Sequence, residues 1–152
     1  MNPGRFANIG LAAAILAGGI ALTACNKGKQ ESSGGASNAA PAAAAAIGVG
    51  PISKVDVGAL DAALAAQGEK VFSGTCAACH KMDQRYVGPA LGGVTKRRTP
   101  EWIMNMILNP TGMTQQDPTA KALLGEYMTQ MSVSVTEADA RALLEYFRKL
   151  DG

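Results

Sequence analysis

The feature that most constrains this chain is a run of five residues, Cys76-Ala77-Ala78-Cys79-His80. If the run is helical, its two thiols lie about one turn apart, and an imidazole follows at once. The rest of the 152-residue chain holds one further cysteine, Cys25, and no second histidine. Any site built from Cys and His must therefore be built around this run.

The C-x-x-C-H pattern is the attachment signature of c-type haem. Two thiols at this spacing can reach the two vinyl groups on one porphyrin edge, and the adjacent imidazole can bind the iron. A zinc site would need a fourth ligand besides Cys76, Cys79 and His80. A thioredoxin-like motif would need a βαβ context, and a plain disulfide would leave His80 unexplained. We expect one haem c, covalent through Cys76 and Cys79, with His80 on the iron.

Residues 1–24 have the pattern of an export signal. Arg5 precedes an uncharged run over residues 6–24, which is long enough that an uncleaved membrane anchor is the alternative. Leu22-Thr23-Ala24-Cys25 resembles the bacterial lipobox, and this resemblance implies cleavage before Cys25 and acylation of that cysteine. We therefore expect a membrane-anchored lipoprotein on the extracytoplasmic, periplasmic side of a bacterial membrane.

Two further segments follow the expected acylation site. Residues 25–55 are rich in Ala, Gly, Ser and Pro, which predicts a flexible tether. Residues 56–152 show recurring helix signals and almost no strand signals, which predicts a small all-α domain. That domain has 10 Lys and Arg against 11 Asp and Glu, so a nucleic-acid partner and strong electrostatic steering are not expected.

Helix signals predict four helices in this domain. The first covers the apolar face of residues 60–72 and ends near Ser73-Gly74. The second begins at Thr99-Pro100 and closes before Pro110, and the third begins at Asp117-Pro118. The last follows Thr136, which opens a near capping box. Residues 81–99 lack periodicity, so we expect a long loop wrapped around a bound group.

Three segments resemble monohaem class I cytochromes c, over roughly residues 60–152. They are the helix Gly68-Glu69-Lys70-Val71-Phe72 before the Cys-His motif, the segment Val87-Gly88-Pro89-Ala90-Leu91, and the final Leu143-Leu144-Glu145-Tyr146-Phe147. The resemblance implies the small all-α fold of that family, with short helices and loops around one haem. It also implies a hydrogen bond from His80 Nδ1 to the Pro89 carbonyl, and packing of Gly68 and Phe72 on Tyr146 or Phe147.

The sixth iron ligand is expected to be a methionine, because the chain has no second histidine. In the family this methionine usually stands five or six residues before the C-terminal helix. Met131 is five residues before Thr136, although Ser132 follows it where the family often has Pro. Met128 is the alternative, and Met113, read as a loop residue, also stays open. The remaining domain methionines are expected to be out of reach or in the core (Met82, Met104 and Met106).

Four side chains are candidates to bind the haem propionates: Arg97 and Trp102 first, then Arg98 and Tyr86. An Arg fork suits a carboxylate. The alternative is that Trp102 is simply core and that residues 96–98 form a solvated or docking patch.

An iron with both axial positions filled shuttles one electron and binds no substrate. We expect a membrane-tethered electron carrier and not an enzyme, with no small-molecule substrate. Its donor would be a quinol-oxidising complex or a cytochrome, and its acceptor a terminal oxidase or extracytoplasmic reductase. Residues 94–110 also resemble small cytochromes that accompany nitrous oxide reductase systems, which suggests that reductase as one acceptor. The alternative function is a haem-based sensor or ligand-binding module with a labile sixth ligand.

Overall fold

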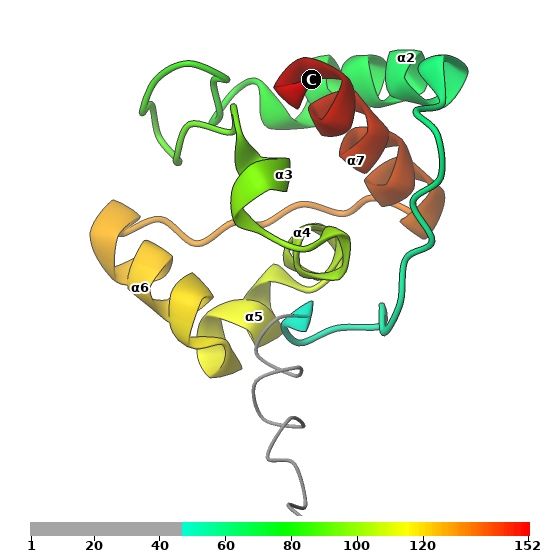
Figure 1. The fold of residues 1–152 in the computed structure, drawn as a ribbon. Coiled ribbons are helices and arrows are strands. Elements are labelled where there is room, and N and C mark those ends of the chain that lie inside the picture. The colour runs from blue at the N-terminus through cyan, green and yellow to red at the C-terminus, as the bar shows by residue number, and fades with distance from the viewer. Residues whose placement is uncertain (1–46) are drawn as a thin grey trace, which may run out of the picture. The chain divides into compact units, whose positions relative to one another are not determined.

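The computed structural model describes residues 47–152, so the predicted export signal, Cys25 and most of the predicted tether lie outside it. This part of the chain is helical and has no strands, which confirms the all-α prediction (Figure 1). Within it, no helix has the length and apolarity to cross a membrane. Its elements are α2 (Ala62–Val71), the π-helical turn η1 (Phe72–Cys76), α3 (Val94–Arg97), α4 (Pro100–Leu108), α5 (Pro110–Gln116), α6 (Pro118–Tyr127) and α7 (Glu137–Asp151).

Local capping fixes the start of three helices as predicted. Thr99 Oγ1 accepts from the Trp102 amide at 3.2 Å at the start of α4. Asp117 Oδ1 accepts from the Ala120 amide at 2.8 Å at the start of α6. A full capping box between Thr136 and Asp139 opens α7. These short-range signals suffice because each satisfies amides within its own first turn.

Three helical features differ from the prediction. Residues 110–116 form α5 and are not a loop, because Asn109 caps the turn and Pro110 occupies its first position. The expected loop of residues 81–99 contains α3. The first helix does not end near Ser73-Gly74 but continues through η1, where the Ala77 amide donates to Phe72 O at 2.9 Å.

The helix α3 is capped from a distance. Its preceding residue, Gly93, has φ +73° and no side chain to cap with. Asp151, at the end of α7, accepts instead from the Gly93 amide at 2.6 Å, and from the Thr95 amide and hydroxyl at 2.9 and 2.6 Å. Asp151 of α7 therefore holds part of the loop of residues 81–99, in which the sequence showed no helix signal.

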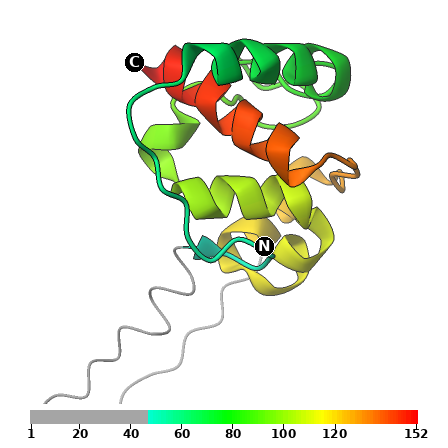
Figure 2. The same cartoon turned by 90° about the vertical axis from the view of Figure 1, so that its right-hand side faces the viewer.

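The helices α2 and α7 pack closely against each other (Figure 2). A Cβ at buried Gly68 would overlap the backbone carbonyl of Ala142, so only glycine permits this approach. The Phe72 ring lies 5.6 Å from the Tyr146 ring and 6.3 Å from the Phe147 ring, between centroids. The Phe72 contacts implied by the family resemblance are thus confirmed, whereas Gly68 meets the backbone of Ala142 and Leu143 instead of an aromatic ring.

One buried carboxylate lies beside this crossing. The Glu145 side chain is fully buried and accepts hydrogen bonds from Arg141 and Arg148. Burial alone would raise its pKa, but these charged donors outweigh that effect and hold the pKa below its usual value. Arg148 also donates to Gly58 O at 2.8 Å, so the cluster ties the chain before α2 to α7.

Residues 47–55, here called the strap, lie along α4 and α5. Side chains of these helices hold the strap by hydrogen bonds to its backbone N–H and C=O groups. Asn105 of α4 is fully buried, and its amide nitrogen donates to Ile47 O and Ile52 O, both at 2.8 Å. Its oxygen accepts from the Ile52 amide at 2.9 Å. One side chain thus fixes two points of the strap.

The same face of α4 extends this attachment at both ends. Glu101 Oε1 accepts from the Val55 amide at 2.8 Å, and Asn109 Nδ2 donates to Val49 O at 3.1 Å. Residues 101, 105 and 109 are four apart and therefore form one row along the helix. The prediction of a flexible tether up to residue 55 was wrong for its last nine residues, because this row on a distant helix pairs their polar groups.

Candidate haem site

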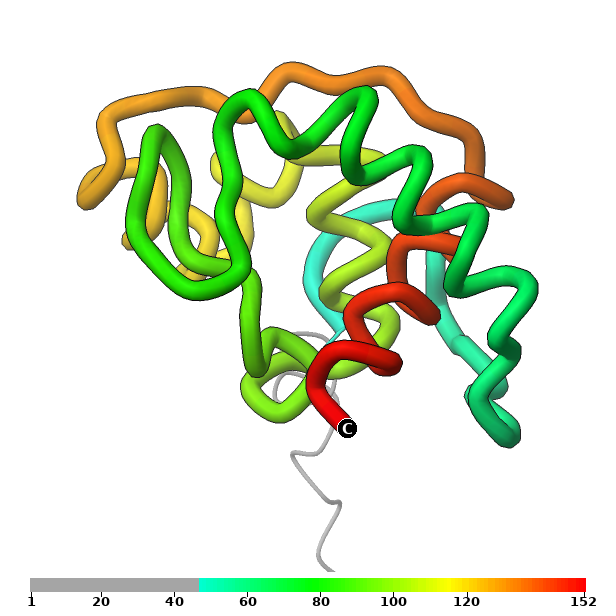
Figure 3. Tube along the Cα trace, turned by 90° about the horizontal axis from the view of Figure 1, so that it is seen from above, coloured from blue at the N-terminus to red at the C-terminus, as the bar shows by residue number. Residues whose placement is uncertain are grey.

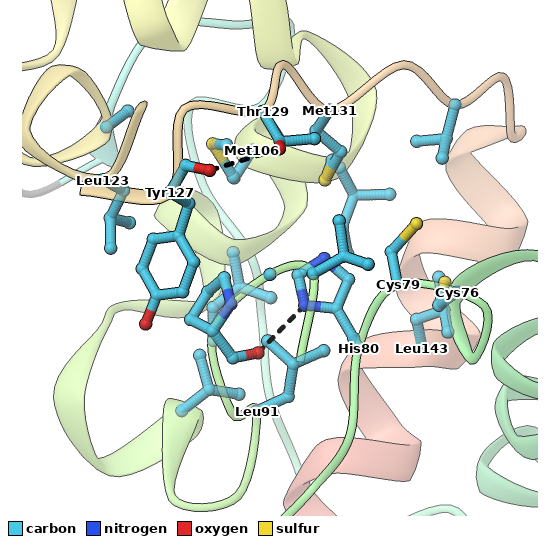
Figure 4. Close-up of a pocket in the computed structure, with 18 of the residues that line it drawn as sticks. Cys76, Cys79, His80, Leu91, Met106, Leu123, Tyr127, Thr129, Met131 and Leu143 are labelled. Atoms are coloured by element: carbon cyan, nitrogen blue, oxygen red, sulfur yellow. Dashed lines mark hydrogen bonds between the residues drawn. The ribbon is translucent and has the colours of Figure 1, made fainter. Parts of the chain in front are cut away.

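A largely apolar cavity of about 420 Å³ lies between the Cys-His motif, the loop that follows it, and the helices α4, α6 and α7 (Figure 4). This volume is within the usual range for cofactor pockets. Its apolar walls include Val87, Leu91, Trp102, Ile103, Met106, Ile107, Leu123, Leu124, Leu143 and Phe147. The loop of residues 81–99 does enclose a space, as the sequence predicted.

The motif forms one wall of this cavity. The π-helical turn η1 leads directly into it, and the His80 amide donates to Cys76 O at 2.9 Å. Cys76 and Cys79 both line the cavity as free thiols, so the structure does not contain the alternative disulfide. Burial, with Cys79 close by, raises the pKa of the Cys76 thiol. Over residues 47–152, no three His, Cys, Asp or Glu side chains group as a metal site.

The His80 ring is oriented by the loop opposite. Its Nδ1 lies 3.0 Å from Pro89 O, which is the hydrogen bond expected from the resemblance. A carbonyl oxygen only accepts, so the proton must sit on Nδ1, and the Nε2 lone pair is left for a metal. Gly88 packs on the same ring, where a Cβ would lie 2.5 Å from His80 Cε1.

The structure places the three methionines considered as iron ligands in different surroundings. Met131, in the segment of residues 128–135, points into the cavity that also holds the His80 ring (Figure 4). Met128 is 83% exposed and closes α6 with φ +52°, away from the cavity wall. Met113 lies in α5, fully buried, with its sulfur accepting from the Val49 amide at 2.9 Å. Of the three candidates the structure brings only Met131 to the site, and ligation by Met131 stays a prediction.

The propionate candidates are also separated by the structure. Trp102 is buried, lines the cavity, and has the Arg98 guanidinium 5.1 Å from its ring centroid. Arg97 lines the cavity, and its Nη1 donates to Gly92 O at 2.7 Å. Tyr86 is 56% exposed and does not line it. A role of Arg97 or Trp102 toward propionates stays a prediction.

Sequence reasoning missed several contributors to this site. Leu123 and Tyr127 reach the cavity from α6, and Gln130 and Thr114 line it beside Met131. No local pattern marks them, because the fold brings them together from separate helices. Gly88 carried a signal, the Gly-Pro segment, but its packing against an imidazole required the structure.

The donors present fit a c-type haem. Two thiols and an imidazole share the cavity with two thioethers, which is a ligand set suited to haem iron. The thioethers are those of Met131 and of Met106, which was expected in the core but lines the cavity from α4. The absent Cβ of Gly88 leaves the room that the imidazole ring needs. The apolar walls suit the faces of a porphyrin and would keep water from it.

Known proteins show the same pattern. The family model described as cytochrome c matches residues 65–151. A cytochrome c from Rhodothermus marinus is 50% identical, with a TM-score of 0.69, covering 72% of this chain and 96% of its own. An engineered cytochrome c from that organism, bound to a carbene intermediate, is 48% identical with the same coverages and a TM-score of 0.67. No curated protein matches the chain.

Proposed function

The chain belongs to the cytochrome c family of electron carriers and binds haem c through Cys76 and Cys79, and we propose that His80 and Met131 would bind the haem iron. The haem supplies a one-electron iron couple when bound. The observation that supports the proposal is one apolar cavity that holds the His80 ring and the Met131 thioether together. With both side chains on the iron, the protein would carry electrons and bind no substrate.

The residues around the iron site have distinct tasks in this proposal. The Pro89 carbonyl accepts from Nδ1 of the His80 ring and so fixes the ring's orientation, with Nε2 turned to the iron site. A thioether is a soft ligand and raises the potential relative to harder ligands. Ferric haem carries one more positive charge than ferrous haem. The apolar walls disfavour that charge and should therefore favour the ferrous form. We propose electron transfer and not carbene chemistry as the role of this chain. The relative that binds a carbene intermediate is an engineered protein, so its ligand is no guide to a natural substrate.

We further propose that the domain is tethered to the extracytoplasmic face of a bacterial membrane. The lipobox-like Leu22-Thr23-Ala24-Cys25 supports acylation at Cys25. The stretch from Cys25 to Ile47 spans about 80 Å at most if fully extended. Such a tether would keep the carrier concentrated near membrane complexes. The proposed donor is a quinol-oxidising complex or a cytochrome, and the acceptor a terminal oxidase or a reductase, including that for nitrous oxide.

The ligand proposal is tested by the visible spectrum of the haem-loaded chain with and without CO. We expect a ferrous spectrum that CO leaves unchanged, and a Met–iron charge-transfer band in the ferric form. Met131→Ala should lose that band and bind CO, while Met128→Ala, at an exposed methionine, should behave as wild type. A wild-type protein that takes up CO at once would contradict the proposal and favour the sensor function.

The tether is tested by fractionating a bacterium that expresses the full chain. Cys25→Ser should move the cytochrome from the membrane fraction to the soluble extracytoplasmic fraction, or leave an uncleaved precursor. Labelled fatty acid should be incorporated into the wild type and not into the variant. Equal labelling of both proteins, or membrane retention of the mature variant, would exclude acylation at Cys25 as the anchor.

A further inference from the structure

Arg85 lies in the loop after His80, yet it contacts the end of α6. Its Nη1 donates to Glu126 Oε1 at 2.8 Å, and its Nη2 donates to Glu126 O at 3.1 Å. Its guanidinium carbon lies 4.1 Å from the centroid of the Tyr127 ring. Arg85 and Glu126 are 41 residues apart in the chain. We call these three residues the Arg85 clasp.

The clasp joins the segments that carry the two axial ligands. Arg85 stands between His80 and Pro89, in the loop that orients the His80 ring. Tyr127 ends α6, and Met131 follows four residues later. Tyr127 itself lines the cavity (Figure 4), so Arg85 stacks on a ring at the cavity wall. Figure 3 shows the loop and the end of α6 on the same side of the molecule.

Few other interactions hold the Met131 segment in place. Residues 129–135 make no backbone–backbone hydrogen bond to any other described residue. At the exposed edge of the cavity, Gln130 accepts from Thr114 Oγ1 at 3.0 Å and donates to Met131 O at 3.1 Å. At its start, the segment follows α6, whose last turn is closed by the Met128 amide donating to Leu124 O at 2.9 Å and is contacted from outside by Arg85.

We propose that Arg85 is a positioning residue that keeps the Met131 segment closed over the haem and so sets how easily Met131 is displaced from iron. This inference rests on the proposed ligation by Met131. An exposed ion pair alone contributes little. Here the guanidinium also donates to a carbonyl at a helix C-terminus, where a cation is favoured, and stacks on an aromatic ring. The combined contacts should make displacement of Met131 measurably harder.

The test uses the ferric, haem-loaded full chain and imidazole as the competing ligand. Arg85→Gln should bind imidazole about five- to tenfold more tightly than wild type, read from loss of the Met–iron charge-transfer band. Glu126→Gln should have a smaller effect, because it leaves the carbonyl and the ring contact. Glu69→Gln is the matched control: it removes an exposed carboxylate 3.9 Å from Lys149 and should stay within about twofold of wild type.

Three outcomes would overturn the clasp. Arg85→Gln could bind imidazole as wild type does, or no more tightly than Glu69→Gln does. Glu126→Gln could also bind imidazole as tightly as Arg85→Gln does. The ion pair would then account for the whole effect, and the carbonyl and ring contacts would contribute nothing. Circular dichroism of each variant checks that it is folded, which is expected because Arg85 and Glu126 side chains are 56% and 54% exposed.

Met131→Ala separates a failure of the clasp from a failure of the ligand proposal. If the charge-transfer band is lost in Met131→Ala and Arg85→Gln is unchanged, only the clasp is wrong. If the band persists in Met131→Ala, the ligand proposal is wrong and the clasp is overturned with it.

Discussion

At the scale of single residues, the site depends on close packing around His80 as much as on the ligands. The Pro89 carbonyl accepts from Nδ1 and orients the ring, and Gly88 leaves room for the ring to lie there. The two residues are adjacent in the chain, so one short segment does both tasks. A side chain at residue 88 should therefore disturb the ligand without removing it.

The change Gly88→Ala tests this packing. Its Cβ would lie 2.5 Å from Cε1 and 2.9 Å from Nδ1 of His80, so the ring or the loop must move. We expect a loss of about 1–3 kcal/mol in the free energy of unfolding, with a changed reduction potential. Denaturant unfolding and redox titration of the haem-loaded protein measure both. In Gly125→Ala, where a Cβ meets open space, stability should stay level or rise by about 0.5–1 kcal/mol. Equal behaviour of the two variants would contradict the packing argument.

At the scale of elements, the sequence predicted those helices whose signals lie within their own first turn. Thr99, Asp117 and Thr136 cap their helices as expected. The signal for α5, Asn109-Pro110, has the same form and was overlooked. In contrast, α3 takes its cap from Asp151, 58 residues from Gly93, so no local pattern could reveal it.

The capping of α3 by Asp151 predicts a pH dependence. Burial alone would raise the pKa of Asp151, but the hydrogen bonds from Thr95 and Gly93 outweigh it and lower the pKa. The carboxylate therefore stabilises the fold above its unfolded pKa of about 3.9, and this stability is lost as the pH falls through the lower, folded pKa.

The variant Asp151→Asn measures that contribution. At pH 7 it should lower the free energy of unfolding by about 1–2 kcal/mol, and the difference from wild type should shrink in acid. Denaturant unfolding at several pH values checks this. Asp56→Asn is the control, since the Asp56 side chain is 86% exposed, and it should have little effect at any pH. A difference that is constant with pH would mean that the carboxylate charge is not involved.

The crossing of α2 and α7 gives a second prediction at this scale. In Gly68→Ala the new Cβ meets the Ala142 carbonyl, which is backbone and cannot rotate away. The helices must separate, which should cost about 1–3 kcal/mol or more of unfolding free energy. Thermal unfolding of the haem-loaded protein gives the measurement, with Gly125→Ala again as the control. An unchanged midpoint for Gly68→Ala would mean that the helices approach less closely than described.

At the scale of the whole molecule, the sequence predicted the residues that would bind the haem better than the long-range contacts that hold the surrounding segments in place. The motif located Cys76, Cys79 and His80, and the spacing usual in the family it resembles selected Met131, which the structure brings to the same cavity. Arg85 and Asn105 were missed because their partners are 41 and up to 58 residues away. Low-complexity composition also concealed the strap, whose backbone groups are bound by α4.

The strap predicts the result of removing Asn105. Asn105→Ala leaves the Ile52 amide and carbonyl without their buried partner, which should cost about 2–3 kcal/mol of unfolding free energy. Hydrogen exchange at Ile52 should also become faster, while exchange in α7 changes only with global stability. Gln115→Ala, at an exposed residue of α5, should leave Ile52 exchange unchanged. Slow Ile52 exchange in Asn105→Ala would show that the strap is held by other contacts.

The row of residues on α4 also determines where mechanical load enters the domain. A pull on the chain from its N-terminal side arrives at Ile47, and Asn105 holds both Ile47 and Ile52. The load passes into α4 before it can reach α2 and the turn that bears Cys76 and Cys79. Arg148, bonded to Gly58 O, forms a second stop before α2. Tension on the leading end of the chain therefore meets these hydrogen bonds before it reaches the thiols that attach the haem.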